Sequence, residues 1–331
     1  MAPSHEARFT WSELLRCVGG PLVALSLFAG AMHLGAALGL LPPPRPALDV
    51  DRAILIHQAE ASRRPQEAAL VLLGDSSCLM DVSAVRLGER LGCGALNLGT
   101  LSYLDLPAQG SLLQAYVAAN PGRLRMVVLL MHPTALRLQD PPGYYTGVLR
   151  DYWAGREHRG GRRLADRLEA WCGLTGFRER FVGRWLPIAL PGDYGPAYGF
   201  TTDLWRQLTA QRGSLLDPGR FDARAEHGSA EYRLARRFEA ESFAFRASVP
   251  TDVRLAVGIT PTPASLALPN HAATCERMLH QWGEWIQADV VLTNLPAVMP
   301  QAFFASDTHL NAAGVRQFTD ALAAQLKALG D

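Results

Sequence analysis

Short, wholly apolar runs alternate along this chain with longer segments in which apolar residues recur at helical spacing. Runs of the first kind are typical of parallel strands that are buried on both faces. They predict strands over residues 68–73, 95–98, 125–131, 254–259 and 290–293. Segments with helical spacing cover residues 84–91, 107–119, 264–285 and 311–329. This order predicts an α/β fold with a five-stranded, mostly parallel sheet and right-handed crossovers.

The longest apolar run lies near the N-terminus. No residue from Cys17 to Leu41 is charged, and three consecutive prolines follow the run. As a helix it would be about 37 Å long at about 1.5 Å per residue, which is enough to cross a bilayer. We therefore expect a short tail, a transmembrane anchor and a linker, over residues 1–16, 17–41 and 42–66.

Two other interpretations apply to this run. A cleaved signal peptide has a shorter apolar core, of about 7–15 residues. A buried helix of a soluble protein is seldom apolar on all sides over such a length. Arginines flank the run almost evenly, so the positive-inside rule favours a cytoplasmic N-terminus only slightly. That orientation makes the chain a single-pass protein of the cytoplasmic (inner) membrane, with its body in the periplasm.

Residues 139–250 interrupt the alternation of strands and helices. The segment is polar, rich in arginine and aromatic residues, and lacks a strand pattern. Helical spacing recurs over residues 162–185 and 231–245. We expect a helical insertion within a domain that spans 67–331. Its aromatic residues pack on the core, line a groove for substrate, or lie on the membrane surface.

Composition narrows the classes of function. The chain has 331 residues and a net charge of +1, which gives no general attraction to nucleic acid. Its 5 cysteines show neither a C-x-x-C pair nor the spacing of a metal site. No glycine-rich phosphate loop is present. We therefore expect no metal and no cofactor.

The first predicted strand ends in Gly74, Asp75, Ser76 and Ser77. Sites in parallel α/β sheets form at the carboxyl ends of strands, so these hydroxyls lie at the expected edge. N–H groups at the start of the next helix suit a developing oxyanion. Taken alone, Ser76 or Ser77 is explained equally well as a helix cap.

A carboxylate and an imidazole, Asp307 and His309, stand two residues apart before the final helix. A serine hydroxyl needs a base, and the base needs a group that orients it. The alternative is a surface loop in which Asp307 caps the helix. Together the two motifs predict Ser76 as nucleophile, His309 as base and Asp307 as its orienting group, with Ser76 and His309 within hydrogen-bond reach.

Three motifs resemble blocks of the SGNH (GDSL-type) hydrolase superfamily. They are Gly74-Asp75-Ser76, Asn97-Leu98-Gly99 and the Asp307/His309 pair, and the resemblance covers roughly residues 66–138 and 251–331. It implies a flavodoxin-like three-layer sandwich that hydrolyses or transfers acyl groups on esters. It also implies an oxyanion hole formed by the backbone N–H groups of Ser76 and Gly99.

The chain departs from the family pattern in two blocks. The third block is usually Gly-x-Asn-Asp, whereas here the third strand ends in Met131, His132, Pro133 and Thr134. The asparagine donor is therefore missing, or it is replaced by His132 or Thr134. The last block is usually Asp-x-x-His and is here Asp-x-His. This spacing is similar to that of the alginate O-acetyltransferase branch, whose periplasmic or membrane-tethered members modify polysaccharides.

The resemblance implies an anchored, serine-dependent esterase or O-acyltransferase that acts on acetyl groups of an exported polysaccharide. Transferases of this kind act with a multi-span membrane O-acyltransferase, which is the implied partner. Two alternatives remain. One is an anchored lipase or thioesterase. The other is a non-catalytic SGNH-like scaffold subunit of a polysaccharide secretion or acylation complex, which the missing asparagine favours. Hydrolysis and transfer use the same triad, so the sequence does not separate them.

Overall fold

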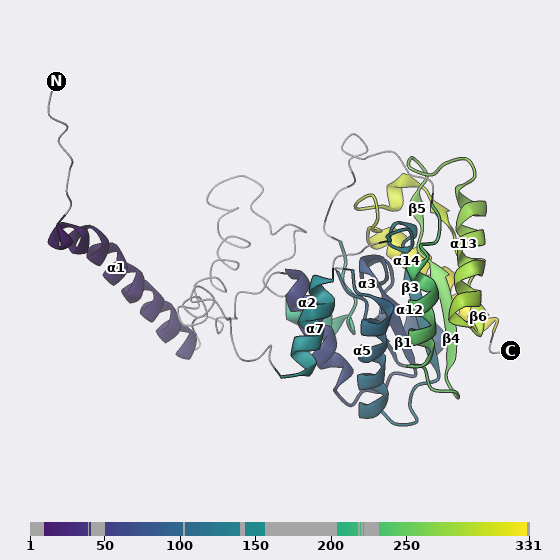
Figure 1. The fold of residues 1–331 in the computed structure, drawn as a ribbon, viewed down its shortest axis with the longest axis horizontal. Helices are drawn as coiled ribbons and strands as arrows, with labels where there is room; N and C mark the ends of the chain where they lie inside the picture. The colour runs from purple at the N-terminus through teal and green to yellow at the C-terminus, as the bar shows by residue number, and fades with distance from the viewer. Residues whose placement is uncertain are drawn as a thin grey trace, which may run out of the picture. The chain divides into compact units, whose positions relative to one another are not determined.

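The structure is a computed structural model that describes residues 10–38, 40, 50–101, 103–139, 143–155, 204–217, 219, 221 and 232–329. The chain divides into two compact units. One consists of Met1–Leu48 and Arg159–Pro196, and the other of Asp49–His158 and Ala197–Asp331. The first unit contains the N-terminal helix α1, and the second contains the sheet (Figure 1).

Helix α1 (Trp11–Ala37) is long and apolar enough to cross a membrane. It begins before Cys17 because Thr10 and Glu13 form a capping box. The Thr10 backbone N–H donates to Glu13 Oε2 at 2.8 Å, and the Glu13 N–H donates to Thr10 Oγ1 at 3.3 Å. Nearly all side chains of the apolar stretch are exposed, which is typical of a helix in contact with lipid.

The second unit is built on a five-stranded sheet with strand order β2-β1-β3-β4-β6. Every neighbouring pair is parallel. The strands are β1 (Leu70–Gly74), β2 (Ala95–Asn97), β3 (Met126–Met131), β4 (Arg254–Ile259) and β6 (Val290–Val291). This confirms the predicted α/β sheet. A small additional pair, β5 (Thr262–Pro263) and β7 (Val298–Met299), was not predicted, because two residues are too few to show a pattern.

Helices cover both faces of the sheet and make a three-layer α/β arrangement (Figure 1). On one face, Leu72 and Val128 pack with Phe318 of α14 (Ala312–Lys327), and α14 packs beside α4 (Ala84–Leu91). On the opposite face, Gly283 of α13 (His271–Ile286) lies against Val257. Next to α13 come α12 (Arg237–Arg246) and then α5 (Leu106–Ala119). Burial on both faces explains why the strands are apolar throughout.

Most predicted helices agree with the structure to within a few residues. The exception is the segment 264–285, where α13 begins only at His271 because the preceding residues form a turn after β5. The helices that were not predicted include three very short ones: α3 (Ser76–Asp81), α6 (Pro133–Leu136) and the 3₁₀ helix η2 (Gln301–Phe303). Each is shorter than two turns and so gives no periodic signal.

Residues 50–62 belong to the folded body and are not a spacer. They form α2 (Val50–Ser62), whose side chains Ile54, Leu55 and Ala59 are buried. The helix packs on α5 and on α7 (Tyr144–Trp153). Within the predicted insertion, α7, α11 (Leu204–Ala210) and α12 are helical. The predicted helix over 162–185 lies outside the described residues.

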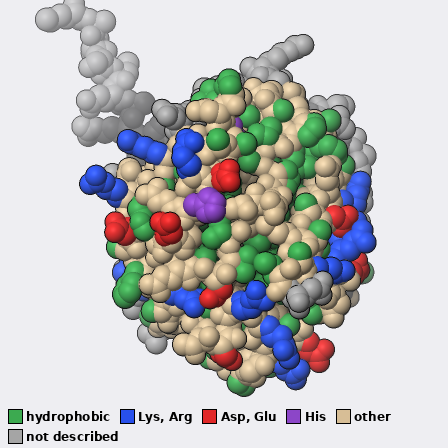
Figure 2. All heavy atoms as spheres, turned by 90° about the vertical axis from the view of Figure 1, so that its right-hand side faces the viewer, with side chains coloured by type: hydrophobic (Ala, Val, Ile, Leu, Met, Phe, Trp, Pro, Cys, Tyr) green, Lys and Arg blue, Asp and Glu red, His purple; other side chains and the backbone are tan. Residues whose placement is uncertain are grey.

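Acidic and basic side chains are mixed on the face of the molecule shown in Figure 2, with apolar patches between them. No extended area of this face is of one sign. That distribution agrees with the net charge of +1 and gives this face no general affinity for a polyanion.

Candidate active site

Ser76 lies where β1 gives way to α3. The turn begins at Gly74, which has φ +151°, and a Cβ there would lie 1.8 Å from the Leu130 carbonyl oxygen. Only glycine fits this close approach. Asp75 caps α3 by accepting the Ser77 N–H, so the cap is neither serine. In the stretch 71–82, Ser76 is the one residue that is not buried. Its hydroxyl is therefore not used as a helix cap, and Ser76 is partly accessible to a substrate.

Ser76, His309 and Asp217 form a continuous hydrogen-bonded chain. The Ser76 Oγ lies 2.9 Å from His309 Nε2, which confirms the predicted approach of these two residues. On the other side of the ring, His309 Nδ1 lies 2.9 Å from Asp217 Oδ2. A carboxylate only accepts, so the proton is on Nδ1. Nε2 is then the acceptor for the Ser76 hydroxyl proton, as a general base requires.

Asp307 does not orient His309, and that prediction is wrong. Its side chain is exposed, and it accepts only a 3.5 Å hydrogen bond from the Thr308 hydroxyl. The tight turn over 305–309, closed by the His309 carbonyl oxygen, directs Asp307 away from the ring. Asp307 is not the helix cap either, because Asn311 accepts the N–H groups of Ala313 and Gly314 at the start of α14.

Asp217 reaches the site through a segment that runs along the free edge of β2. The Asn97 N–H donates to the Arg212 carbonyl at 2.9 Å, and the Leu215 N–H donates to the Leu79 carbonyl at 3.0 Å. Between them, Gly213 has φ +87°, and a Cβ there would lie 1.8 Å from the Asn97 carbonyl oxygen. The segment is thus held against the sheet just before Asp217.

Gly213→Ala is expected to lower both thermal stability and activity. The left-handed backbone and the contact with Asn97 together cost about 1–3 kcal/mol or more. Any displacement of the segment also moves Asp217 away from His309. Thermal unfolding and ester hydrolysis measure the two effects. Gly122→Ala is the matched control, since Gly122 has φ +69° but no neighbouring atom within 4 Å of an added Cβ. Equal losses in the two variants would contradict the role of the close contact.

Opposing effects set the protonation of the triad. Burial alone would lower the pKa of His309, but the hydrogen bond to Asp217 and the nearby carboxylates of Asp81 and Asp75 outweigh it and raise the pKa. Burial alone would raise the pKa of Asp217, but the hydrogen bonds from His309 and the Gly219 N–H lower it. Asp217 is therefore ionised in the range where His309 titrates.

The pH dependence of activity follows from these directions. A base must be neutral, so kcat/KM falls as His309 is protonated. Because the pKa of His309 is raised above 6.5, the acid limb of the profile is expected to have its midpoint above pH 6.5. A pH–rate profile of kcat/KM measures it. In Asp217→Asn the lost carboxylate should move this limb to lower pH, and an unmoved limb would contradict the assignment.

Two further carboxyl groups, Asp81 and Asp75, lie close to His309, and neither was predicted as a site residue. Asp81 is fully buried and accepts the Leu310 N–H at 2.7 Å, next to His309. Burial raises its pKa to about 8, while the nearby His309 and the hydrogen bond from the Leu310 N–H act in the opposite direction. Asp75 is also buried and accepts hydrogen bonds from the Ser77 hydroxyl and the His132 N–H. These hydrogen bonds hold the backbone next to Ser76 and next to His309.

The predicted oxyanion donor Gly99 is already occupied. Its N–H donates to Asn97 Oδ1 at 2.8 Å, and its carbonyl accepts Gln58 Nε2 at 2.8 Å. A Cβ at Gly99 would lie 2.7 Å from the Leu79 backbone nitrogen, so the turn is pressed against α3. The prediction that the Gly99 N–H forms part of the oxyanion hole is therefore wrong. Within the described chain the Ser76 N–H has no hydrogen-bond partner and remains available.

Thr134 is half-buried, and its backbone N–H donates to His132 Nδ1 at 3.2 Å. His132 is buried at the start of α6, beside Asp75. Thr134 therefore contributes a backbone contact to the histidine. Of the two residues proposed to replace the asparagine, His132 is the one with a buried side-chain donor that has no partner in the described part of the chain.

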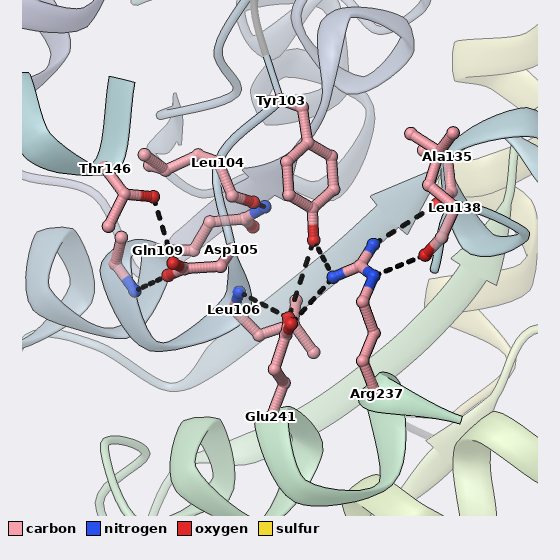
Figure 3. A network of polar contacts seen from close by, with 11 residues as sticks. Tyr103, Leu104, Asp105, Leu106, Gln109, Ala135, Leu138, Thr146, Arg237 and Glu241 are labelled. Atoms are coloured by element: carbon pink, nitrogen blue, oxygen red, sulfur yellow. Dashed lines mark hydrogen bonds and ion pairs between the residues drawn. The ribbon is translucent and has the colours of Figure 1, made fainter. Parts of the chain in front are cut away.

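Arg237 ties together the loops that follow β2 and β3 (Figure 3). Its guanidinium donates to the Tyr103 hydroxyl and to the carbonyls of Ala135 and Leu138, and it pairs with Glu241 at 2.7 Å. Glu241 in turn accepts the N–H of Leu106 at 3.2 Å. All these partners of Arg237 and Glu241 belong to the folded body. The network therefore holds together the loops at the edge of the site.

No metal centre is evident in the portion of the chain that the structure describes, where no group of three or more His, Cys, Asp or Glu side chains converges. Comparisons with models of protein families, with characterised proteins and with solved structures found no match to this chain. The assignment of the site therefore depends on its own geometry, in which hydrogen bonds join a partly exposed serine, a buried histidine and a half-buried aspartate.

Proposed function

We propose that this chain is a serine-dependent ester hydrolase or O-acyltransferase of the SGNH type. The observation on which the proposal depends is the chain of contacts from Ser76 through His309 to Asp217. A hydroxyl, an imidazole and a carboxylate in this order are the parts that nucleophilic acyl transfer needs. The site lies at the carboxyl end of β1, where open parallel sheets place their ligands.

The chemistry follows from the protonation of the triad. His309 Nε2 accepts the proton of Ser76 as its oxygen attacks the ester carbonyl, and Asp217 stabilises the imidazolium that forms. His309 then gives this proton to the leaving alcohol, and an acyl group remains on Ser76. In the second half, His309 deprotonates water or an acceptor hydroxyl, which attacks the acyl-serine. Water yields a hydrolase, and a sugar hydroxyl yields a transferase.

The order of the core strands, with β1 between β2 and β3, supports a flavodoxin-like arrangement. Helix α1 supports attachment to a membrane, with the body in the periplasm as the proposed orientation. Asp307 lies away from His309, so the short spacing of this pair no longer argues for a polysaccharide substrate. An exported polysaccharide as acceptor, with a multi-span O-acyltransferase as partner, is the part of the proposal that depends on the membrane helix and the family resemblance alone.

A direct test uses the full-length protein in detergent micelles with a chromogenic acetyl ester. Rates are measured with and without an oligosaccharide acceptor, and before and after treatment with a fluorophosphonate, which reacts with activated serines. We expect turnover that the fluorophosphonate abolishes. Faster product release with acceptor, together with an acetylated sugar detected by mass spectrometry, would identify a transferase.

Three other results lead to different conclusions. Turnover that no acceptor changes would identify a hydrolase. A rate that rises with the chain length of the ester would identify the lipase or thioesterase alternative. The absence of both turnover and labelling by the fluorophosphonate would contradict catalysis. That result would favour the scaffold subunit.

A further inference from the structure

The end of β3 brings His132 beside the nucleophile. Gly74 pairs with Leu130 in the parallel register of β1 and β3, and Ser76 and His132 lie two positions beyond this pair. Neighbouring strands are about 4.8 Å apart. The backbone N–H of His132 donates to Asp75 Oδ2 at 3.0 Å, which ties the two strand ends together where the chain leaves the sheet.

The hydrogen bonds of His132 determine where its ring proton lies. Nδ1 accepts the Thr134 N–H at 3.2 Å, as the N-cap of α6. A nitrogen that accepts cannot bear a proton, so the proton of the neutral ring is on Nε2. Burial, with smaller contributions from the charges of His309, His271 and Arg137, lowers the pKa of His132 to about 3. The ring is therefore neutral wherever the triad works.

The Nε2–H of this ring is a buried donor without an acceptor. His132 is 4% exposed, and its Nε2 has no hydrogen-bond partner in the described part of the chain. Leaving such a group unpaired costs about 1–3 kcal/mol. In native structures such a donor is usually completed by an ordered water, an ion, a ligand or an intermediate. The contact of the His132 backbone with Asp75, the residue before Ser76, indicates which intermediate would do so.

We propose that the Nε2–H of His132 donates a hydrogen bond to the oxyanion that forms when Ser76 attacks the substrate carbonyl. This inference rests on the proposed function. With the Gly99 N–H occupied by Asn97, the oxyanion hole consists of the Ser76 N–H and His132. No proton is transferred by His132. The bond strengthens as charge develops on the oxygen, so it lowers the barrier and hardly affects ground-state binding.

Two substitutions distinguish the role of Nδ1 of His132 from the role of its Nε2. In His132→Ser the side-chain oxygen can take the place of Nδ1 and cap α6 by accepting the Thr134 N–H, but no donor reaches the position of Nε2. In His132→Gln the amide can present a donor near that position, while the cap is weakened. The full-length protein in micelles is assayed with the chromogenic acetyl ester, alongside thermal unfolding of each variant.

For His132→Ser we expect kcat to fall by about 10²- to 10³-fold, with KM changed by less than about threefold. His132→Gln should recover at least about tenfold of that loss. A purely structural histidine gives the opposite order, with Ser active and Gln impaired, and this outcome overturns the inference. Nitrogen-15 NMR of the histidine ring is an assay that needs no variant. It should show a proton on Nε2, and a proton on Nδ1 would overturn the inference.

These results remain distinct from a failure of the proposed function. If the wild type shows turnover that Ser76→Ala abolishes while His132→Ser keeps the wild-type kcat, only the inference about His132 is lost. If the wild type shows no turnover that depends on Ser76, the proposed function and this inference fail together.

Discussion

Ser76→Ala is expected to lower kcat for ester hydrolysis by about 10⁴- to 10⁶-fold, the range seen when a serine hydrolase loses its nucleophile. The variant keeps His309 and Asp217 but has no oxygen to form an acyl intermediate. KM should change little, since the Ser76 hydroxyl contacts His309 and no binding surface is removed. Initial rates over a series of ester concentrations measure both constants.

Stability provides the control for this variant. Ser76 is partly exposed and does not cap α3, so the change to alanine should alter the free energy of unfolding by no more than about 0.5 kcal/mol. Thermal unfolding of the two proteins in the same micelles makes the comparison. If the variant retains its fold and also keeps more than a tenth of the wild-type kcat, Ser76 is not the nucleophile.

Asp217→Asn should lower kcat by about 10²- to 10⁴-fold, because an amide in place of the carboxylate favours the wrong tautomer of His309 and leaves its imidazolium without a counter-charge. Nδ1 would then accept from the amide, and Nε2 would bear the proton. In that state the ring cannot take the proton of Ser76. Rates with the acetyl ester at the pH optimum of the wild type measure the loss.

Asp307→Asn is the matched control for that substitution. It makes the same chemical change two residues from His309, on a side chain that is exposed and does not contact the ring. Its kcat should equal that of the wild type. A large loss in Asp307→Asn with little change in Asp217→Asn would restore the orienting role to Asp307 and contradict the observed geometry.

The sequence was sufficient to predict those strands and helices whose apolar pattern lies within one short segment of the chain. Buried parallel strands are apolar on both faces, so β1, β3 and β4 are visible as apolar runs. Each strand end shows where polar groups can gather. That reasoning placed Ser76 and His309 at one edge of the sheet, although 233 positions separate them along the chain.

The orienting carboxylate could not be found in this way. Asp217 lies in a polar region without strand or helix periodicity, and a backbone pairing with the edge of β2 brings it to the site. Sequence proximity made Asp307 the natural choice, but the turn over 305–309 directs that side chain to solvent. The one local signal for Asp217 is its place after the apolar pair Leu215 and Leu216 and before Gly219. This pattern marks a turn that leaves a packed segment.

The oxyanion hole shows a second limit of sequence reasoning. A motif predicts which residue stands in a turn but not which side chain has taken its N–H. At Gly99, the amide of Asn97 two residues earlier folds back and accepts that hydrogen bond. The free donor at His132 is likewise visible only when the partners of both ring nitrogens are known.

The central claim is that Ser76 becomes acylated during turnover. The most direct measurement mixes the full-length protein with a chromogenic acetyl ester, stops the reaction with acid before steady state, and locates the acetyl group by tandem mass spectrometry of the proteolysed chain. The account predicts an acetyl group on Ser76 in the wild type and no acetyl group at this position in Ser76→Ala. An acetyl group on another residue, or an unmodified Ser76 while product is being released, would contradict it.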